Sequence, residues 1–221
     1  MPEKIWTDVE TFIDGTLIGH NRLLEETLAA SAAAGLPPIA VSPGQGKFLQ
    51  ILARAVKARR ILEVGTLGGY STIWLAGALP EGGRIVTLEA DQHHAHVARE
   101  NFARASLDDV IELRFGKAHD TMPAMITERG EPFDFIFIDA DKKRIPLYFE
   151  WAMKMAHSGT LIVVDNVVRG GALADATSRD EHVIGVRELH EHLARDARVS
   201  ATTLQTVGAK GYDGFTVAIV L

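Results

Sequence analysis

The feature that most constrains this chain is the stretch from Arg60 to Ser71, in which a short apolar run ends in glycines and a helical pattern follows. This order predicts a strand, a tight turn and a helix. Gly65, Gly68 and Gly69 allow a sharp turn and a close approach of the backbone to a ligand, because a Cβ at such positions would clash. The turn is either an ordinary strand-to-helix connection or the site of a small nucleotide-like ligand.

The residue at position 63 narrows the choice of ligand. The dinucleotide fingerprint Gly-x-Gly-x-x-Gly would need its first glycine there, and this chain has Glu63. A carboxylate at that point repels a pyrophosphate, whereas it accepts a hydrogen bond from an ammonium group. Glu63 and Gly65 therefore favour a nucleoside that carries an amino acid over NAD, and S-adenosylmethionine is the candidate.

Hydrophobic periodicity predicts alternating strands and helices along the chain after residue 60. Strands are expected at 61–64, 84–89, 110–115, 133–139 and 161–165, and a C-terminal antiparallel hairpin at 199–206 and 215–221, with its turn at 207–214. Helices are expected at 42–56, 70–79, 91–105, 118–129, 146–156 and 181–194. This order predicts an α/β fold with a twisted, mostly parallel sheet.

Residues 5–34 show the three- and four-residue spacing of two further helices, which end before Gly35, Pro37 and Pro38. These helices form either a cap on the core or a dimer surface or active-site lid. With 221 residues, of which 47% are hydrophobic, the chain is long enough for one sizeable core. We therefore expect a single domain, 1–221, with a helical extension at 1–58 and an α/β core at 59–221.

Charge and composition exclude several classes of function. The net charge is −6, so no dominant basic surface is expected and nucleic acid is an unlikely partner; a small-molecule substrate is favoured. The absence of cysteine excludes disulfides, thiolate zinc sites and a cysteine nucleophile. The first residues do not have the pattern of a signal peptide, and no apolar run reaches the length of a membrane span. We expect a cytoplasmic protein with no membrane partner.

Polar residues stand at the carboxyl ends of the predicted strands, where open α/β sheets bind ligands. Glu89 ends the second strand, at the distance from the glycine turn at which an acid hydrogen-bonds the ribose hydroxyls of adenosine-containing ligands. His119 follows the third strand and is a candidate for contact with an adenine ring. The triplet His93, His94 and His96 does not share one helix face, and neither do His190 and His192, so these histidines predict no metal site.

The fourth and fifth strands end in a second set of polar residues, which suits a metal ion. Asp139 ends the fourth strand, and Asp165 and Asn166 end the fifth. Their oxygens are ligands for Mg²⁺, or for another divalent cation such as Ca²⁺ or Mn²⁺, and three protein ligands leave room for water and a chelating substrate. Lys142 lies close by, where a neighbouring cation and partial burial would make it a general base. Asp141 is either a helix cap or a residue that orients the metal ligands without touching the ion.

Three of these segments together resemble a known family, the cation-dependent class I O-methyltransferases of the caffeoyl-CoA and catechol O-methyltransferase group. The segments begin at Glu63, Phe133 and Asp165, and read EVGTLGGYS, FDFIFIDADK and DNVVRGG. They occur in the family's order, and the resemblance extends from about Val41 to the C-terminus. It implies a Rossmann-like class I methyltransferase fold, with a seven-stranded, mostly parallel sheet, helices on both faces and a C-terminal antiparallel hairpin.

The resemblance also implies roles for particular residues. The contacts to S-adenosylmethionine would come from Val41, Glu63, Gly65, Thr66, Ser71, Glu89, Ala118 and Asp141. Asp139, Asp165 and Asn166 would bind the cation, and Asp139 and Lys142 would be the catalytic residues. Where plant members have an aromatic residue, this chain has Arg169, which resembles the bacterial branch.

We therefore expect S-adenosylmethionine- and divalent-cation-dependent O-methylation of a catechol-like acceptor, a vicinal dihydroxy aromatic, by SN2 transfer, and a homodimer. The cation would hold the two adjacent oxygens of the acceptor, with the sulfonium methyl in line with one of them. Two alternatives remain open at this point: methylation of a hydroxylated tRNA base, and an NAD-binding oxidoreductase or catalytically silent nucleotide-binding module.

Overall fold

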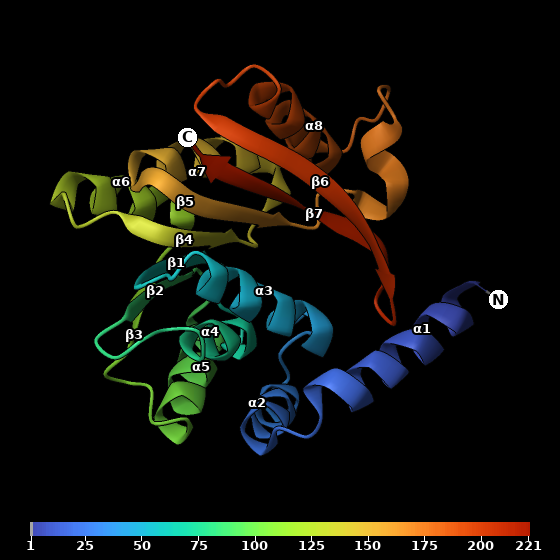
Figure 1. Cartoon of the computed structure of the whole chain (residues 1–221), viewed down its shortest axis with the longest axis vertical. Coiled ribbons are helices and arrows are strands. Elements are labelled where there is room, and N and C mark those ends of the chain that lie inside the picture. The colour runs from blue at the N-terminus through green and yellow to red at the C-terminus, as the bar shows by residue number, and fades with distance from the viewer. Residues whose placement is uncertain (1) are drawn as a thin grey trace.

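The computed structural model describes residues 2–221, and a single seven-stranded sheet runs through them (Figure 1). The strands lie in the order β3-β2-β1-β4-β5-β7-β6. Their bounds are β1 Arg60–Val64, β2 Arg84–Glu89, β3 Ile111–Phe115, β4 Phe133–Ile138, β5 Ala156–Asp165, β6 Val199–Gly208 and β7 Gly211–Val220. Neighbouring strands among β1 to β5 pair in parallel, and β7 is antiparallel to both β5 and β6. The predicted mostly parallel sheet with a C-terminal hairpin is confirmed.

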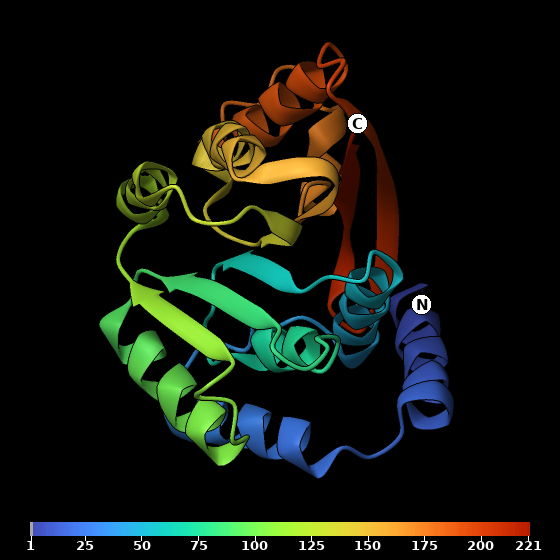
Figure 2. The same ribbon diagram turned by 60° about the vertical axis from the view of Figure 1, so that its left-hand side comes forward.

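Helices cover both faces of this sheet, as Figure 2 shows. They are α1 Pro2–Ile13, α2 Arg22–Ala33, α3 Pro43–Ala55, α4 Tyr70–Ala76, α5 Gln92–Arg104, α6 Ala118–Glu128, α7 Ile145–Lys154 and α8 Glu181–Leu193. Short helical turns are η1 Asp14–Ile18, η2 Lys142–Arg144 and η3 Arg169–Ala174. No described helix is long and apolar enough to cross a membrane.

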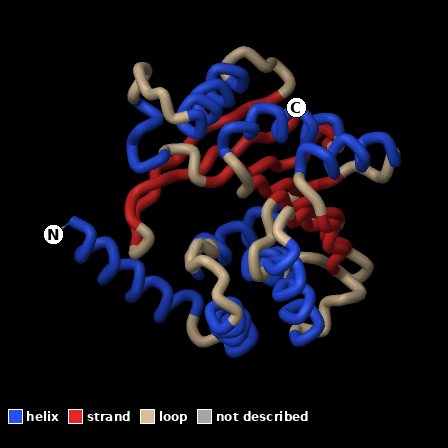
Figure 3. Tube along the Cα trace, turned by 180° about the vertical axis from the view of Figure 1, so that it is seen from behind, coloured by secondary structure: helices blue, strands red, loops and turns tan. Residues whose placement is uncertain are grey.

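Two apolar clusters, one on each face, hold the layers together. On one face, side chains of α2 to α5 such as Leu49 and Phe102 pack with Phe135 and Phe137 of β4. On the other face, helices α6, α7 and α8 contribute Met122, Phe149 and Leu189, which pack on the alternate residues of the strands. The strands between them carry nearly continuous apolar runs because both of their faces are buried. Figure 3 shows the two helical layers on either side of the strands.

Sequence patterns place the helix starts well, because capping residues are local signals. Ser42 accepts a hydrogen bond from Gln45 N–H, and Pro43 occupies the first helical position of α3, as predicted. Asp91 accepts hydrogen bonds from the N–H groups of His93 and His94 at the start of α5. The expected division between an extension at 1–58 and a core at 59–221 stays a prediction, although Leu49 of α3 packs within the main core.

The structure corrects two predicted boundaries. The hairpin turn is not the whole segment 207–214, because β6 and β7 stay paired as far as Gly208 and Gly211, and only Ala209 and Lys210 connect them. The N–H of Ala209 donates to the Glu10 carboxylate of α1, which holds the tip of this long hairpin against the N-terminal helix (Figure 1). Strand β5 begins at Ala156, where a helix was predicted to end, because Ala156 pairs with Phe133 across an irregular register.

Candidate active site

A cavity of about 730 Å³ opens at the carboxyl ends of β1, β2 and β4. The strand order reverses between β1 and β4, and ligands of open α/β sheets bind at such a reversal. Most of the residues predicted for cofactor and chemistry line this cavity: Val41, Gly65, Thr66, Ser71, Glu89, Ala118, Asp139, Asp141, Lys142 and Asn166. His119, predicted near an adenine ring, lines it as well. The fold thus brings ten of the twelve predicted site residues to one cavity, and leaves Glu63 and Asp165 outside its lining.

The glycine turn brings two strand ends together. Gly65 has φ +104°, a conformation that side-chain-bearing residues rarely adopt, and a Cβ there would clash with the backbone carbonyl oxygen of Asp139. The Gly65 N–H donates to the carbonyl of Leu88 at 3.0 Å. The turn therefore packs closely against β2 and β4, and the end of β1 lies directly beside the end of β4.

Glu63 does not face this cavity. Its side chain is fully buried and accepts hydrogen bonds from the hydroxyls of Ser71 (2.7 Å), Thr72 (2.5 Å) and Thr87 (2.7 Å). Burial raises the pKa of Glu63 to about 7, against the effect of these three donors. In the described structure the Glu63 carboxylate faces these three hydroxyls, and its contact with an ammonium group stays a prediction. Glu63 orients Ser71, which does line the cavity.

Glu89 holds the turn in place from β2. Its Oε2 accepts hydrogen bonds from the N–H groups of Thr66 (3.2 Å) and Leu67 (2.7 Å), and its Oε1 accepts one from Asp91 N–H (2.9 Å). It also lines the cavity, which is the position predicted for contact with a ribose. A single side chain thus joins the glycine turn to the wall of the cavity.

Asp141 lies between the cavity and the helical layer. Its Oδ1 accepts a hydrogen bond from Arg144 N–H at 3.2 Å, so it caps η2 as anticipated. The hydroxyl of Tyr148 donates to its Oδ2 at 2.5 Å, and burial raises the pKa of Tyr148 above the ordinary tyrosine range. Sequence reasoning missed Tyr148, because in the sequence it is one more apolar position of α7.

The predicted cation ligands lie at the edge of the same cavity. Lys142, of which only 4% is exposed, donates from Nζ to Asp139 Oδ1 at 2.8 Å. Asp165 is also 4% exposed, and burial together with the charge of Asp139 raises its pKa to about 7. Asn166 follows with φ +52°, and its N–H donates to Asp165 Oδ1 at 2.8 Å. Two acids that repel each other are thus held at one place in a largely buried environment.

Gln45 is a further member of this group. Its Nε2 donates to Asp165 Oδ2 at 2.7 Å from the first turn of α3. The sequence contained no signal for this contact, because 120 positions separate the two residues and only the packing of α3 beside β5 joins them. Both carboxylate oxygens of Asp165 therefore accept a hydrogen bond, Oδ1 from Asn166 N–H and Oδ2 from Gln45, and these bonds fix the orientation of the side chain.

A second cavity, of about 910 Å³, adjoins the first. Its walls come from α1, the start of α3, the end of β5 and the tip of the β6–β7 hairpin. Of the two cavities, Asp165 lines only the second, whereas Asn166 and Arg169 line both. The predicted cation ligands therefore stand at the junction of two compartments, each large enough for a small molecule.

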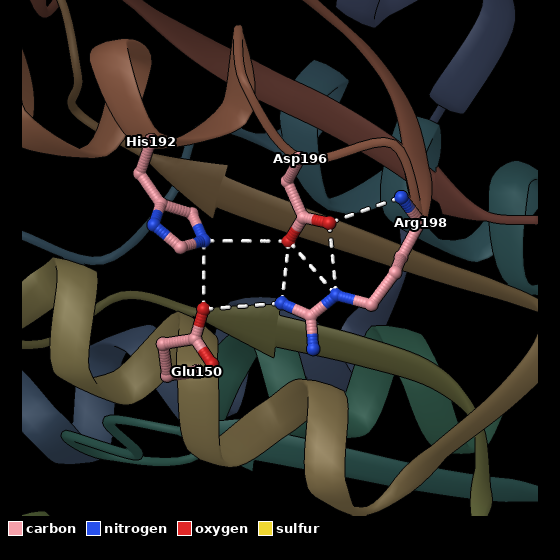
Figure 4. A network of polar contacts seen from close by, with 4 residues as sticks. All are labelled: Glu150, His192, Asp196 and Arg198. Carbon is pink, nitrogen blue, oxygen red and sulfur yellow. Dashed lines mark hydrogen bonds and ion pairs between the residues drawn. The ribbon is translucent and has the colours of Figure 1, made fainter.

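One other cluster of acids and a histidine lies away from both cavities (Figure 4). His192 Nε2 is 2.7 Å from Glu150 Oε1 and 3.3 Å from Asp196 Oδ2. The guanidinium of Arg198 contacts both carboxylates, at 3.2 Å from Glu150 and 2.5 Å from Asp196. Because a cationic side chain already occupies this position, the cluster is an ion-pair network that ties α7 to α8. His190 lies outside this network, because its Nε2 contacts Thr203 Oγ1 at 2.8 Å.

The fold and the paired cavities define the class of the protein. The reversal between β1 and β4, together with the antiparallel β7 between β5 and β6, is the Rossmann-like class I methyltransferase fold. The family model described as "O-methyltransferase" matches residues 16–219. The chain therefore belongs to the O-methyltransferase family, and the predicted family and fold are confirmed.

Similar proteins cover the chain almost completely. A catechol O-methyltransferase of Niastella koreensis is 47% identical over 220 residues, which is 100% of both chains. A catechol O-methyltransferase of Mycobacterium tuberculosis is 51% identical, over 96% of this chain and 95% of its own. The structure of an O-methyltransferase from Bacillus cereus in complex with SAH is 55% identical, with a TM-score of 0.97 and 99% of each chain covered. The oxidoreductase alternative is set aside by this membership.

Proposed function

We propose that this enzyme transfers the methyl group of S-adenosylmethionine to one hydroxyl of a catechol-like acceptor, with the help of a divalent cation. The observation that carries the proposal is the position of Asp139, Asp165 and Asn166 at the junction of the two cavities. Such a position lets an acceptor in one cavity meet a methyl donor in the other. The names of the similar proteins, catechol O-methyltransferases and an SAH-bound O-methyltransferase, support the same assignment.

In this proposal the first cavity holds the methyl donor. Gly65 and Thr66 contribute backbone that can approach it closely, Glu89 accepts from the ribose hydroxyls, and Ser71, oriented by Glu63, contacts its amino-acid part. Val41, Ala118 and Asp141 complete the wall around it. The Glu63 carboxylate acts through Ser71.

The oxygen ligands at the junction fit a divalent cation such as Mg²⁺. Asp139 and Asp165 contribute carboxylates and Asn166 an amide oxygen, the hard donors that Mg²⁺ and Ca²⁺ prefer. Burial, together with the charge of Asp139, raises the pKa of Asp165, and a bound positive ion would offset both effects. When bound, the ion lowers the pKa of a chelated hydroxyl and fixes its orientation.

The side chains around the junction then support a direct displacement. In its neutral amine form, Lys142 Nζ, which lies 2.8 Å from Asp139 Oδ1, would take the proton that leaves the acceptor hydroxyl. The acceptor oxygen forms a bond to the methyl carbon as the carbon–sulfur bond breaks, and the electron pair stays on sulfur. Gln45 keeps Asp165 in one orientation throughout. Much of the rate comes from holding the two substrates in line.

A chelator experiment tests the proposal. The purified protein, catechol and S-adenosylmethionine are incubated with Mg²⁺ or with excess EDTA, and the methylated catechol is quantified by liquid chromatography. We expect methylation with Mg²⁺ and at least a hundredfold loss both with EDTA and in Asp165→Ala. Asp109→Ala, which removes an exposed acid far from the junction, is the matched control. Full activity in EDTA or in Asp165→Ala would exclude the role of the cation.

We also propose that the enzyme is a homodimer that uses the N-terminal helix. Helix α1 leaves large apolar side chains in solvent, with Ile5 62%, Val9 52% and Phe12 72% exposed. An apolar stripe of this kind on a helix that lines the second cavity is a candidate contact surface. Multi-angle light scattering should give twice the mass of the chain, and Phe12→Glu should give the monomer mass. A monomeric wild type would exclude this proposal.

A further inference from the structure

Two buried polar atoms without hydrogen-bond partners in the described chain belong to residues that line the second cavity. They are Arg169 Nε and Asp14 Oδ1. A guanidinium nitrogen that is buried without a hydrogen-bond partner has lost its hydrogen bond to water, which costs free energy. A ligand with a hydrogen-bond acceptor at this point removes that cost. Arg169 also lines the first cavity, so its guanidinium stands beside the junction at which the chemistry is proposed.

Hydrogen bonds to a side chain of β7 fix the backbone at Arg169. Arg169 has φ +57°, the left-handed region in which a side-chain-bearing residue is uncommon. Its N–H and that of Val168 both donate to Asp213 Oδ1 at 2.9 Å. The strand-to-helix connection is therefore held against β7, and the base of the Arg169 side chain has a defined position in the wall of the cavity.

Two basic side chains in the wall of this cavity form no ion pair with another described residue and can therefore pair with a ligand. These side chains are Arg169 and Lys210. Two of the neighbouring acids already accept backbone N–H groups: Asp213 from Val168 and Arg169, and Glu10 from Ala209. Lys210, at the tip of the β6–β7 hairpin, lines the second cavity together with Asp165 and Asn166.

Asp14 is the one unpartnered acid of the cavity among the described residues. Its Oδ1 lies next to Gly44 in the first turn of α3, where the partial positive charge of a helix N-terminus stabilises an anion. Burial, together with the charge of Glu10, raises the pKa of Asp14 from its ordinary value.

We infer that the acceptor of this enzyme carries a carboxylate on its dihydroxy aromatic ring, and that Arg169, assisted by Lys210, recognises that group. This inference rests on the proposed function and names the class of acceptor that the second cavity selects. The guanidinium offers paired N–H donors in a plane that matches a carboxylate, and such charge-assisted hydrogen bonds are stronger than neutral ones. Arg169 is thus a specificity-determining residue.

Three acceptors with the same ring test the inference: 3,4-dihydroxybenzoate, its methyl ester and 3,4-dihydroxybenzylamine. With Mg²⁺ and saturating S-adenosylmethionine, we expect kcat/KM of the wild type to be at least tenfold higher for the acid than for the ester, and lowest for the amine. The ionised carboxylate withdraws electrons from the ring less than the ester does. This electronic difference is the same for wild type and variant, so the change of the acid-to-ester ratio between them isolates the recognition of the negative charge. Arg169→Gln should lower the acid-to-ester ratio at least tenfold, which corresponds to about 1.4 kcal/mol.

The ratio separates recognition from a merely structural role, because a structural defect lowers kcat/KM for acid and ester together. Arg169→Lys keeps the charge and should retain an intermediate ratio, and Lys210→Gln should lower the ratio by a smaller factor than Arg169→Gln. A wild type that prefers the ester or the amine overturns the inference, as does an acid-to-ester ratio that Arg169→Gln leaves unchanged. If catechol and all three acceptors remain unmethylated, the proposed function fails and the inference fails with it.

Discussion

The substitution Glu63→Gln replaces the one acid that is enclosed by hydroxyls at the centre of the sheet. The Glu63 carboxylate is fully buried and accepts from Ser71, Thr72 and Thr87. Glutamine keeps the size of the side chain and removes its titration. Its NH₂ group cannot accept a hydrogen bond, so the variant also loses some stability at every pH. That constant loss is separated from the titration by measuring stability across a range of pH.

The magnitude follows from the pKa in the two states. Burial raises the pKa of Glu63 from the ordinary value of 4.5 to about 7 in the folded protein. Because the folded state holds this proton more tightly than the unfolded state, its contribution to stability is complete below pH 4.5 and is lost as the pH rises to about 7. Linkage then gives roughly 2 to 3 kcal/mol of loss between about pH 5 and pH 8, as an order of magnitude.

Urea unfolding at half-unit steps over this range measures the effect. The free energy of unfolding of the wild type, minus that of Glu63→Gln, should fall by roughly 2 to 3 kcal/mol from about pH 5 to pH 8. The subtraction removes the pH-dependent contributions of the other groups that titrate in both proteins, including Asp165. Glu81→Gln, at an exposed position, is the control and should show a constant difference. A difference for Glu63→Gln that is independent of pH, or that grows as the pH rises, would refute the reasoning.

Two further substitutions test other parts of the fold. Gly65→Ala should destabilise the protein by about 2 to 4 kcal/mol in urea unfolding and weaken S-adenosylmethionine binding in calorimetry. The reason is that the added Cβ would clash with the Asp139 carbonyl, at a φ of +104°. An unchanged stability would contradict the close approach of β1 to β4. Asp196→Asn should cost about 1 kcal/mol near pH 7 and less near pH 3. The hydrogen bond with Arg198 lowers the pKa of Asp196, so this stabilisation is present above the unfolded-state value and is lost as the pH falls; an equal cost at both pH values would show that the ion pair contributes nothing.

Much of the fold could be predicted because its signals are local. The apolar runs of β1 and β4 reflect burial on both faces, and the caps at Ser42 and Asp91 mark the starts of α3 and α5 within a few residues of sequence. The hairpin turn was misplaced because its glycines, normally turn signals, lie inside paired strands here. The tip of this longer hairpin contacts Glu10 of α1, at the other end of the chain, which no local pattern indicates.

The candidate site could be predicted only as a set of residues at strand ends. Parallel strands bring their carboxyl ends to one edge, so Glu89, Asp139 and Asp165 could be placed near one another without coordinates. The direction of each side chain could not be known. Glu63 is the last residue but one of β1 and Glu89 is the last residue of β2, yet the first is enclosed by hydroxyls and the second reaches the cavity wall.

By itself the sequence determined the class of fold, the position of the glycine turn and the kinds of ligand that the strand ends can bind. These depend on periodicity, on backbone freedom at Gly65 and on the chemistry of single side chains, all of which are local properties. Only the tertiary structure decided which groups meet: Gln45 with Asp165 across 120 positions, and Arg169 beside a cavity built from both ends of the chain. Such contacts depend on how helices and hairpin pack around the sheet, which no local pattern encodes.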